Sequence, residues 1–193
     1  MAASIDQTEK RLRPPQAATL AVLQDHVIDV AQRGYPILVT GSAFFIVLAA
    51  ISNALPQRAL GLVWIFGMMV IFPTGVMLGA VLRINVMTRD NPLGTLGGLV
   101  AAVQAFFIPV FIVVYQFTPQ YLPLTVGVLG GAHFLPYSWI YRSRAYIFVS
   151  IGTGLASPVV GTVMLSSAYM LVPLAIAVIF AGGVVWIRRE NRR

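Results

Sequence analysis

The sequence contains no cysteine and very few charged residues. None of its 193 residues is cysteine, which excludes disulfides, thiol redox chemistry and metal sites built on thiolates. Charged residues make up 10% of the chain, whereas soluble domains have about 25%. Only six residues are acidic. The composition therefore excludes a sizeable soluble domain.

Long apolar runs fill most of the chain. Hydrophobic residues account for 58% of it, and its mean hydropathy is +0.84. A helix needs about 20 apolar residues to cross a hydrocarbon core of about 30 Å, and six runs are this long. They cover residues 35–55, 59–82, 93–117, 121–141, 145–165 and 168–187. The sequence predicts an all-α, polytopic membrane protein with a bundle of six transmembrane helices.

The basic residues lie almost entirely on one side of this topology. Twelve of the thirteen lysines and arginines precede the first run or follow the second, fourth or sixth, whereas Arg58 lies on the opposite side. Basic loops stay in the cytoplasm, so both termini are predicted to be cytoplasmic. The predicted division is a tail with an amphipathic helix over 1–34, a transmembrane domain over 35–187 and a basic tail over 188–193.

The net charge of +7 raises the question of a nucleic-acid partner. These charges are divided among loop ends at one membrane face, where anionic lipid headgroups attract them. No basic stripe interleaved with aromatic residues is present to follow a phosphate backbone. The predicted partner is therefore the lipid bilayer, and nucleic acid is not expected.

Residues 17–33 form a helical pattern with two unlike faces. Leu23 and Val27 share an apolar face, and Asp25 and Asp29 share a polar one. Two aspartates on the polar face do not favour electrostatic binding to anionic lipid. We expect this helix to lie in the cytoplasmic interface or to pack under the bundle.

Two uncommon polar residues lie within the apolar runs. No Asp, Glu, Lys or Arg is present in any run, which removes the usual ion-coupling carboxylates. Gln104 and His133 each lie about fourteen residues from the turn at Thr118 and Pro119. Because an α-helix rises evenly per residue, both are predicted at one depth on antiparallel neighbours, where they can hydrogen bond.

Prolines inside the runs add polar atoms near this depth. Pro109, Pro136 and Pro158 each remove a helix hydrogen bond and free the carbonyl four residues before. Ser150, Thr153 and Ser157 accompany the last of these. The candidate solute-binding residues are Gln104, His133, Tyr137 and Ser157. Two interpretations stay open: a packing contact inside the bundle, or a site for a solute, water or ion.

A second polar cluster lies in the predicted cytoplasmic loops. The candidate residues of a cytoplasmic mouth are Arg89, Asp90, Asn91 and Arg142. Asn91 is predicted to cap the third helix, with Pro92 at its first position, and Asp90 can pair with Arg89, Arg142 or Arg144. Capping and topology account for these residues, and a gate that attracts anions is the alternative.

Catalytic and metal-binding patterns are missing. One intramembrane histidine without acidic or sulfur partners cannot fill a tetrahedral metal site. The sequence has no H-E-x-x-H, no paired aspartates and no serine with a nearby base. We expect no cofactor, no metal and no enzymatic activity.

Small residues recur at four-residue spacing, which lets helix backbones approach closely. Gly94 and Gly98 have this spacing in the third run, and Gly127 and Gly131 have it in the fourth. The same pattern serves packing within one chain and homo-oligomerisation, and both stay open.

The sequence resembles a known protein family at several of these residues. They are Asn91-Pro92-Leu93, Gln104 and the motif GAHFLPY at residues 131–137, with Trp139 and Tyr141. Together they resemble a family of small bacterial six-span membrane proteins that carries a domain-of-unknown-function label. The similarity covers about residues 60–165. It implies a bacterial inner-membrane location and no particular activity.

The functional prediction is a small transporter- or channel-type protein that moves or binds a small solute at the mid-membrane polar layer. The alternative is a membrane scaffold or accessory subunit whose small-residue faces engage a partner, and a lipid-modifying enzyme comes third. A water-filled mid-membrane cavity that reaches His133 favours the first, and a dry bundle with an exposed small-residue groove favours the second.

Overall fold

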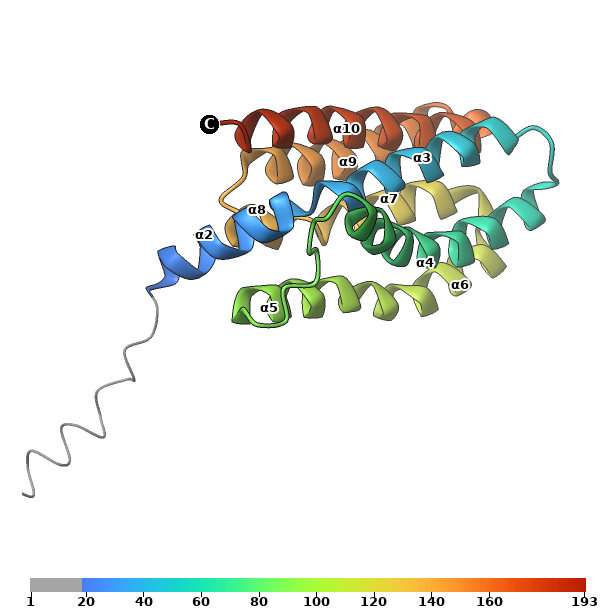
Figure 1. Ribbon diagram of the computed structural model, residues 1–193. Helices are drawn as coiled ribbons and strands as arrows, with labels where there is room; N and C mark the ends of the chain where they lie inside the picture. The colour runs from blue at the N-terminus through green and yellow to red at the C-terminus, as the bar shows by residue number, and fades with distance from the viewer. Residues whose placement is uncertain (1–18) are drawn as a thin grey trace, which may run out of the picture.

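The computed structural model describes residues 19–193, and every regular element in that range is a helix. The predicted tail before residue 19 lies outside the described residues. Figure 1 shows long helices lying side by side with their axes roughly aligned. In chain order the elements, with η for a 3₁₀ helix, are α2 (Leu20–Ala31), η1 (Gln32–Gly34), α3 (Tyr35–Ile51), α4 (Gln57–Val81), α5 (Pro92–Ala102), η2 (Val103–Phe107), α6 (Ile108–Phe117), η3 (Pro119–Tyr121), α7 (Leu122–Ala132), α8 (Leu135–Ile140), α9 (Arg144–Val163), η4 (Leu165–Ser167) and α10 (Ala168–Glu190).

Five helical segments are long and apolar enough to cross a membrane. Each coincides with one of the predicted apolar runs, and the first also includes α2 and η1. The segments are Leu20–Ile51, Gln57–Val81, Pro92–Phe117, Arg144–Val163 and Leu165–Glu190. The chain is therefore a helical membrane protein.

The predicted fourth run, residues 121–141, differs from the others because it is not one helix. α7 ends at Ala132 and α8 begins at Leu135. Pro136 has no N–H to donate to the carbonyl of Ala132, and its ring crowds that carbonyl. Phe134 N donates to Gly131 O at 3.1 Å, so the chain tightens locally to three-residue spacing.

The third run is also interrupted at its middle. The 3₁₀ helix η2 separates α5 from α6, and Pro109 is the second residue of α6. Pro109 cannot donate to the carbonyl of Ala105. The N–H of Ile108 donates to that carbonyl instead. The predicted free carbonyl is therefore satisfied by a turn that is one residue tighter.

The centre of the bundle consists of α3, α7, α9 and α10. α10 packs on α3 and α9, α7 packs on α9, and α4 packs on α3. The ring of Phe45 lies 5.7 Å from that of Trp64 and 5.8 Å from that of Phe180. At Gly131, an added Cβ would lie 2.8 Å from the backbone nitrogen of Gly154. α7 and α9 therefore touch through their backbones at this glycine.

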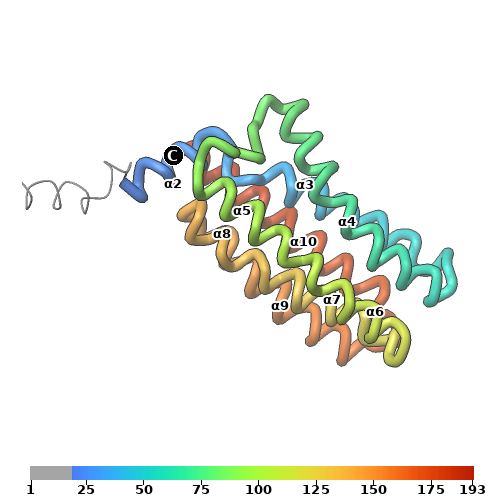
Figure 2. The backbone as a smooth tube through the Cα atoms, turned by 90° about the horizontal axis from the view of Figure 1, so that it is seen from below, coloured from blue at the N-terminus to red at the C-terminus, as the bar shows by residue number. Residues whose placement is uncertain are grey.

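The segment α5–η2–α6 lies at the edge of the bundle. Figures 1 and 2 show it running along the outside of the other helices. Only 6% of the most apolar stretch in Pro92–Phe117 is buried. Lipid or another protein chain must cover the remaining apolar surface in a membrane.

Helix α2 packs under one end of the bundle. Val27 and Ala31 are fully buried, whereas Asp25 is exposed. Gln24 is also buried and its Nε2 donates to Trp139 O at 2.9 Å. The face of α2 that packs on the bundle is therefore apolar except for the hydrogen-bonded amide of Gln24. The opposite face, which contains Asp25, is exposed.

The chain turns sharply between α2 and α3. Gln32, Arg33 and Gly34 have left-handed φ angles of 49°, 53° and 65°, which glycine adopts readily and other residues rarely. The hydroxyl of Tyr146 donates to Arg33 O at 2.6 Å, and Asn191 Nδ2 donates to Gln32 O at 3.1 Å. Contacts from α9 and from the end of α10 thus hold the turn.

Candidate functional site

Gln104 and His133 are in contact, as their equal distance from the outer turn predicts. Nε2 of Gln104 lies 2.7 Å from Nε2 and 3.0 Å from Nδ1 of the His133 ring. Gln104 belongs to η2, and His133 follows the last residue of α7. The predicted hydrogen bond between the two runs is confirmed.

A second contact determines which nitrogen of His133 carries the proton. Nδ1 lies 2.5 Å from the carbonyl oxygen of Gly130. A carbonyl only accepts hydrogen bonds, so Nδ1 must donate. In the neutral ring Nε2 is then the acceptor, and it accepts from the Gln104 amide. Among residues 19–193, no donor is hydrogen bonded to the Gln104 carbonyl oxygen.

Both residues lie where their own helices are interrupted. η2 includes Gln104, and the break between α7 and α8 includes His133. Discontinuous helices are tolerated at membrane depth where they are buried in protein or line a cavity. Two breaks therefore meet at one polar contact.

A small cavity adjoins the Gln104–His133 contact. Its volume is about 50 Å³, and α3, α4, α7, α9 and α10 all contribute to its wall. Thr153 lines it from α9, and this side chain is 1% exposed. Within residues 19–193, Thr153 Oγ1 has no hydrogen-bond partner. A cavity of this size admits a water molecule or a single small polar group.

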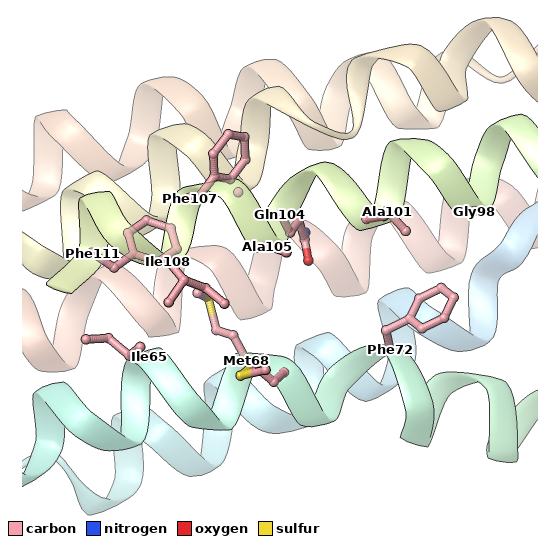
Figure 3. Close-up of a pocket in the computed structure, with 13 residues that line it drawn as sticks. Ile65, Met68, Phe72, Gly98, Ala101, Gln104, Ala105, Phe107, Ile108 and Phe111 are labelled. Atoms are coloured by element: carbon pink, nitrogen blue, oxygen red, sulfur yellow. The ribbon is translucent and has the colours of Figure 1, made fainter.

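A larger apolar cavity lies on the other side of Gln104. It encloses about 290 Å³ between α4 and the α5–η2–α6 segment and is open on one side. Figure 3 shows Met68 and Phe72 on one wall, facing Ile108 and Phe111 on the other. Gln104 has the one polar side chain among the described residues that line it. Met68, Gln104 and Gly130 line both cavities, so the polar contact adjoins the larger apolar cavity.

Tyr137 lies beside this layer without lining either cavity. Its hydroxyl donates to Gly97 O at 2.7 Å, and its ring stacks on that of Tyr141 at 6.0 Å. The contact joins α8 to α5 across the bundle edge. Tyr137 therefore links α8 to α5, and it lies one helical turn after His133.

Ser157 faces α7 instead of the cavity. It is fully buried, and its Oγ has no hydrogen-bond partner within residues 19–193. It packs against Gly127, where an added Cβ would collide with its hydroxyl. Of the two α9 hydroxyls one turn apart, Thr153 is the one that reaches the polar layer. The sequence signal for Thr153 was its place among the hydroxyl residues near Pro158.

Two of the four candidate mouth residues, Asn91 and Arg142, contact α2. Asn91 caps α5 as predicted, since Leu93 N donates to Asn91 Oδ1 at 2.9 Å. Its Nδ2 also donates to Leu23 O at 2.8 Å and lies 3.2 Å from His26 Nδ1. Arg142 forms an ion pair with Asp25. Contacts with α2 therefore account for both side chains.

The other two candidates of this cluster are less engaged. Arg89 and Asp90 are exposed, and neither forms an ion pair within the described residues. Among the predicted partners of Asp90, Arg142 is bound to Asp25 of α2. Asp90 is nearer to Arg142 along the chain than Asp25 is. In the structure, however, α2 docks beside Arg142 and brings Asp25 into contact with it.

Residues 20–190, from the start of α2 to the end of α10, match a family model described as a family of unknown function, DUF7010. The chain belongs to the DUF7010 family. Comparisons with curated proteins and with solved structures find no match. The predicted resemblance to a family of unknown function is confirmed, and the match extends beyond residues 60–165. All residues that line the two cavities fall within the DUF7010 match.

The chemistry available at this site is hydrogen bonding to a neutral group. The cavity walls contain an amide, an imidazole and a hydroxyl, and no charged side chain among the described residues. Within residues 19–193, no three His, Cys, Asp or Glu residues gather where they could hold a metal ion. The DUF7010 site thus suits an uncharged ligand with a polar end and an apolar body.

Proposed function

We propose that this DUF7010 protein is a small transporter- or channel-type membrane protein that binds a small, uncharged, largely apolar solute. The solute enters from the bilayer through the open cavity between α4 and α5–η2–α6. Its polar end hydrogen bonds at the layer of Gln104, His133 and Thr153. The proposal involves no catalytic step and no cofactor.

One observation carries this proposal: the two cavities share Met68, Gln104 and Gly130 as a common wall. An apolar body fits the larger cavity because its other described lining side chains are apolar. A polar end fits beyond Gln104 because Thr153 Oγ1 is buried there without a described partner. A charged solute is disfavoured because no counter-charge lines either cavity among these residues.

The proposed topology has six spans in a bacterial inner membrane, with both termini in the cytoplasm. The broken pair α7 and α8 makes up the span that is missing from the five long segments. The distribution of basic residues supports this orientation. α2 then lies at the cytoplasmic face, against the ends of α5 and α8.

Phenol and toluene are suitable probes because they differ in one hydroxyl. We expect saturation-transfer NMR on the full chain in nanodiscs to detect both, with phenol bound more tightly. Gly98→Phe should abolish binding of both, because Gly98 lines the cavity and nothing lies within 4 Å of an added Cβ there. Leu99→Phe is the matched control, since Leu99 is exposed and outside the lining.

Thr153→Val then tests the polar layer separately. Loss of one hydrogen bond should weaken phenol by about three- to tenfold and leave toluene unchanged. Equal binding of phenol and toluene to the unaltered protein, together with no effect of Gly98→Phe, would contradict the proposed site.

A second candidate function, a scaffold or accessory subunit, is favoured by the exposed α5–η2–α6 segment. Only 6% of its apolar stretch is buried within the chain. The absence of cysteine makes Leu99→Cys a clean reporter of a second copy on this face. A disulfide-linked dimer in membranes would favour assembly through this segment, whereas a monomer that still binds phenol would favour the solute site.

A further inference from the structure

A basic groove lies at the end of the bundle where α9 begins and α10 ends. It encloses about 790 Å³. Five arginines from η1, the α8–α9 loop, the start of α9 and the end of α10 line it: Arg33, Arg142, Arg144, Arg189 and Arg193. Glu190 is the one acidic residue among the described residues of its wall. Segments far apart in sequence thus converge on one positive groove.

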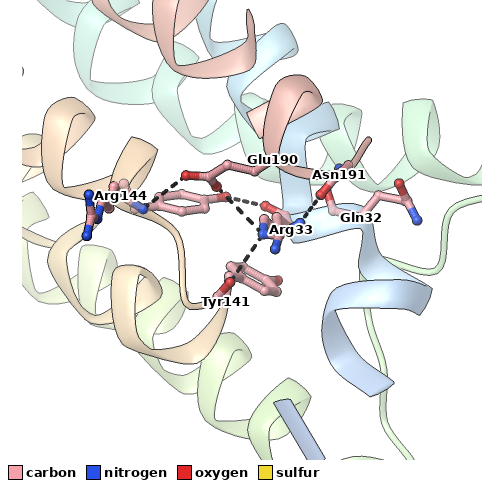
Figure 4. Close-up of polar contacts among 7 residues, drawn as sticks. Gln32, Arg33, Tyr141, Arg144, Glu190 and Asn191 are labelled. Carbon is pink, nitrogen blue, oxygen red and sulfur yellow. Dashed lines mark hydrogen bonds and ion pairs between the residues drawn. The ribbon is translucent and has the colours of Figure 1, made fainter. Parts of the chain in front are cut away.

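The single acid in the groove is already engaged. Glu190 Oε2 lies 3.7 Å from Arg33 Nε, and its Oε1 accepts from the backbone N–H of Arg144 at 3.2 Å. Figure 4 shows Arg33 also contacting Tyr141 and Asn191. Glu190 therefore compensates Arg33 and the first turn of α9, and it is not available to the remaining guanidinium groups.

Three arginines of the groove have no acidic partner. Arg142 is paired with Asp25, whereas Arg144, Arg189 and Arg193 form no ion pair within residues 19–193. All three are exposed, and all three line the groove. Like charges around one hollow repel each other, so an anion between them would be stabilised.

One wall of the groove is apolar. Gly182, Val185 and Trp186 of α10 line it. Val185 and Trp186 are 52% and 42% exposed, and the Trp186 ring lies 5.9 Å from that of Phe148. Gly182 contributes no side chain, which leaves the wall shallow there. A ligand that fills the groove therefore needs an anionic end and an apolar body.

We propose that this groove binds an anionic phospholipid, with its phosphate between Arg144 and Arg189 and an acyl chain along Gly182 and Trp186. Guanidinium groups match phosphate oxygens in pairs. Basic pockets between transmembrane helices on the cytoplasmic side suit lipid headgroups. A soluble phosphate ester has the same anionic chemistry, but the apolar wall favours the lipid.

Fluorescence of Trp186 tests this proposal directly. The chain has three tryptophans, of which Trp64 is fully buried, so Trp139→Phe leaves Trp186 as the exposed one. The full chain is reconstituted in phosphatidylcholine with either dibrominated phosphatidylglycerol or dibrominated phosphatidylcholine at equal fractions. Bromine quenches tryptophan on contact. We expect phosphatidylglycerol to quench Trp186 with an apparent affinity at least about fivefold higher.

Two double variants that remove the same charge test whether the preference for phosphatidylglycerol depends on the arginines of the groove. Arg144→Gln with Arg189→Gln should abolish it, since each arginine near the surface contributes about fivefold. Arg58→Gln with Arg192→Gln removes the same charge outside the groove and should leave it intact. The comparison of the two lipids needs no arginine variant, so misfolding of the first pair would not remove the test.

Inorganic phosphate separates the two sources of the anion. Persistence of the preference in excess phosphate supports the lipid. Loss of it in phosphate, but not in chloride at the same ionic strength, would assign the groove to soluble phosphate and overturn the lipid proposal. Equal quenching by the two brominated lipids would overturn the site altogether.

Discussion

Gln104 and His133 meet at the two points where neighbouring apolar segments stop being α-helical. Nε2 of Gln104 lies 2.7 Å from Nε2 of His133, and Nδ1 of the same ring lies 2.5 Å from Gly130 O. Both side chains are half-buried, and each is a hydrogen-bond partner of the other. The pair adjoins a small cavity on one side and a larger apolar cavity on the other.

Coupling between these two side chains is measurable. Gln104→Leu and His133→Phe should each destabilise the protein, because each leaves a half-buried polar group without its partner. The double variant should recover part of that loss, with a coupling of about 0.6–2 kcal/mol. Unfolding in mixed micelles, followed by tryptophan fluorescence, gives the free energy of unfolding of the unaltered protein and of the three variants. Additive losses would show that the contact contributes nothing.

The double variant also separates a packing contact from a solute site. If the pair only packs, Gln104→Leu with His133→Phe should fold and bind phenol as the unaltered protein does. If it lines the site, the fold should persist while the preference of phenol over toluene is lost. Saturation-transfer NMR reads the preference, and circular dichroism confirms that the helices remain.

Two adjacent glycines of α7 should respond oppositely to alanine. At Gly131 an added Cβ lies 2.8 Å from Gly154 N and 3.0 Å from Ser150 O, and backbone atoms cannot yield cheaply. Gly131→Ala should therefore cost about 1–3 kcal/mol. Gly130→Ala meets nothing within 4 Å and should be neutral or slightly stabilising. Equal effects on the free energy of unfolding would contradict the close approach of α7 and α9.

Docking of α2 depends on the face that contains Val27. Val27→Ser places a hydroxyl in a fully buried position and should loosen the helix, so trypsin should cut faster after Arg33. Val22→Ser is the control, because Val22 is 55% exposed and should leave the rate unchanged. Similar cleavage rates for both variants would mean that α2 is held through other contacts.

The proposed topology is testable with single cysteines in a chain that has none. Arg58→Cys should react with an impermeant maleimide added outside intact cells. Arg89→Cys should react only after the membrane is opened. Arg58 and Arg89 are both exposed, so accessibility to the reagent depends on the side of the membrane. Labelling of Arg89→Cys from outside would reverse or remove the proposed orientation.

The sequence alone determined the helical membrane class and the contact between Gln104 and His133. Both follow from properties that act along the chain: the length of an apolar run, and the constant rise of a helix from a shared turn. The cap by Asn91 is equally local, since its side chain reaches the N–H two residues later.

Tertiary structure decided which other groups join that contact. Thr153 and Ser157 are four residues apart on one face of α9, about 6 Å along its axis, and the sequence favoured Ser157. Gly127 leaves room for Ser157 against α7, so Thr153 is the one that lines the cavity. The choice depends on how α7 and α9 are rotated and shifted, which packing determines.

The ion pair of Arg142 and the position of α5–η2–α6 also depend on packing. Asp25 reaches Arg142 because α2 packs against the end of the bundle where α8 ends, across 117 residues of chain. The sequence of α5–η2–α6 does not distinguish a surface that faces lipid from one that faces protein, because lipid tails are as apolar as leucine. Periodicity therefore predicts that such a helix forms and spans, while the arrangement of its neighbours depends on side-chain fit across the whole bundle.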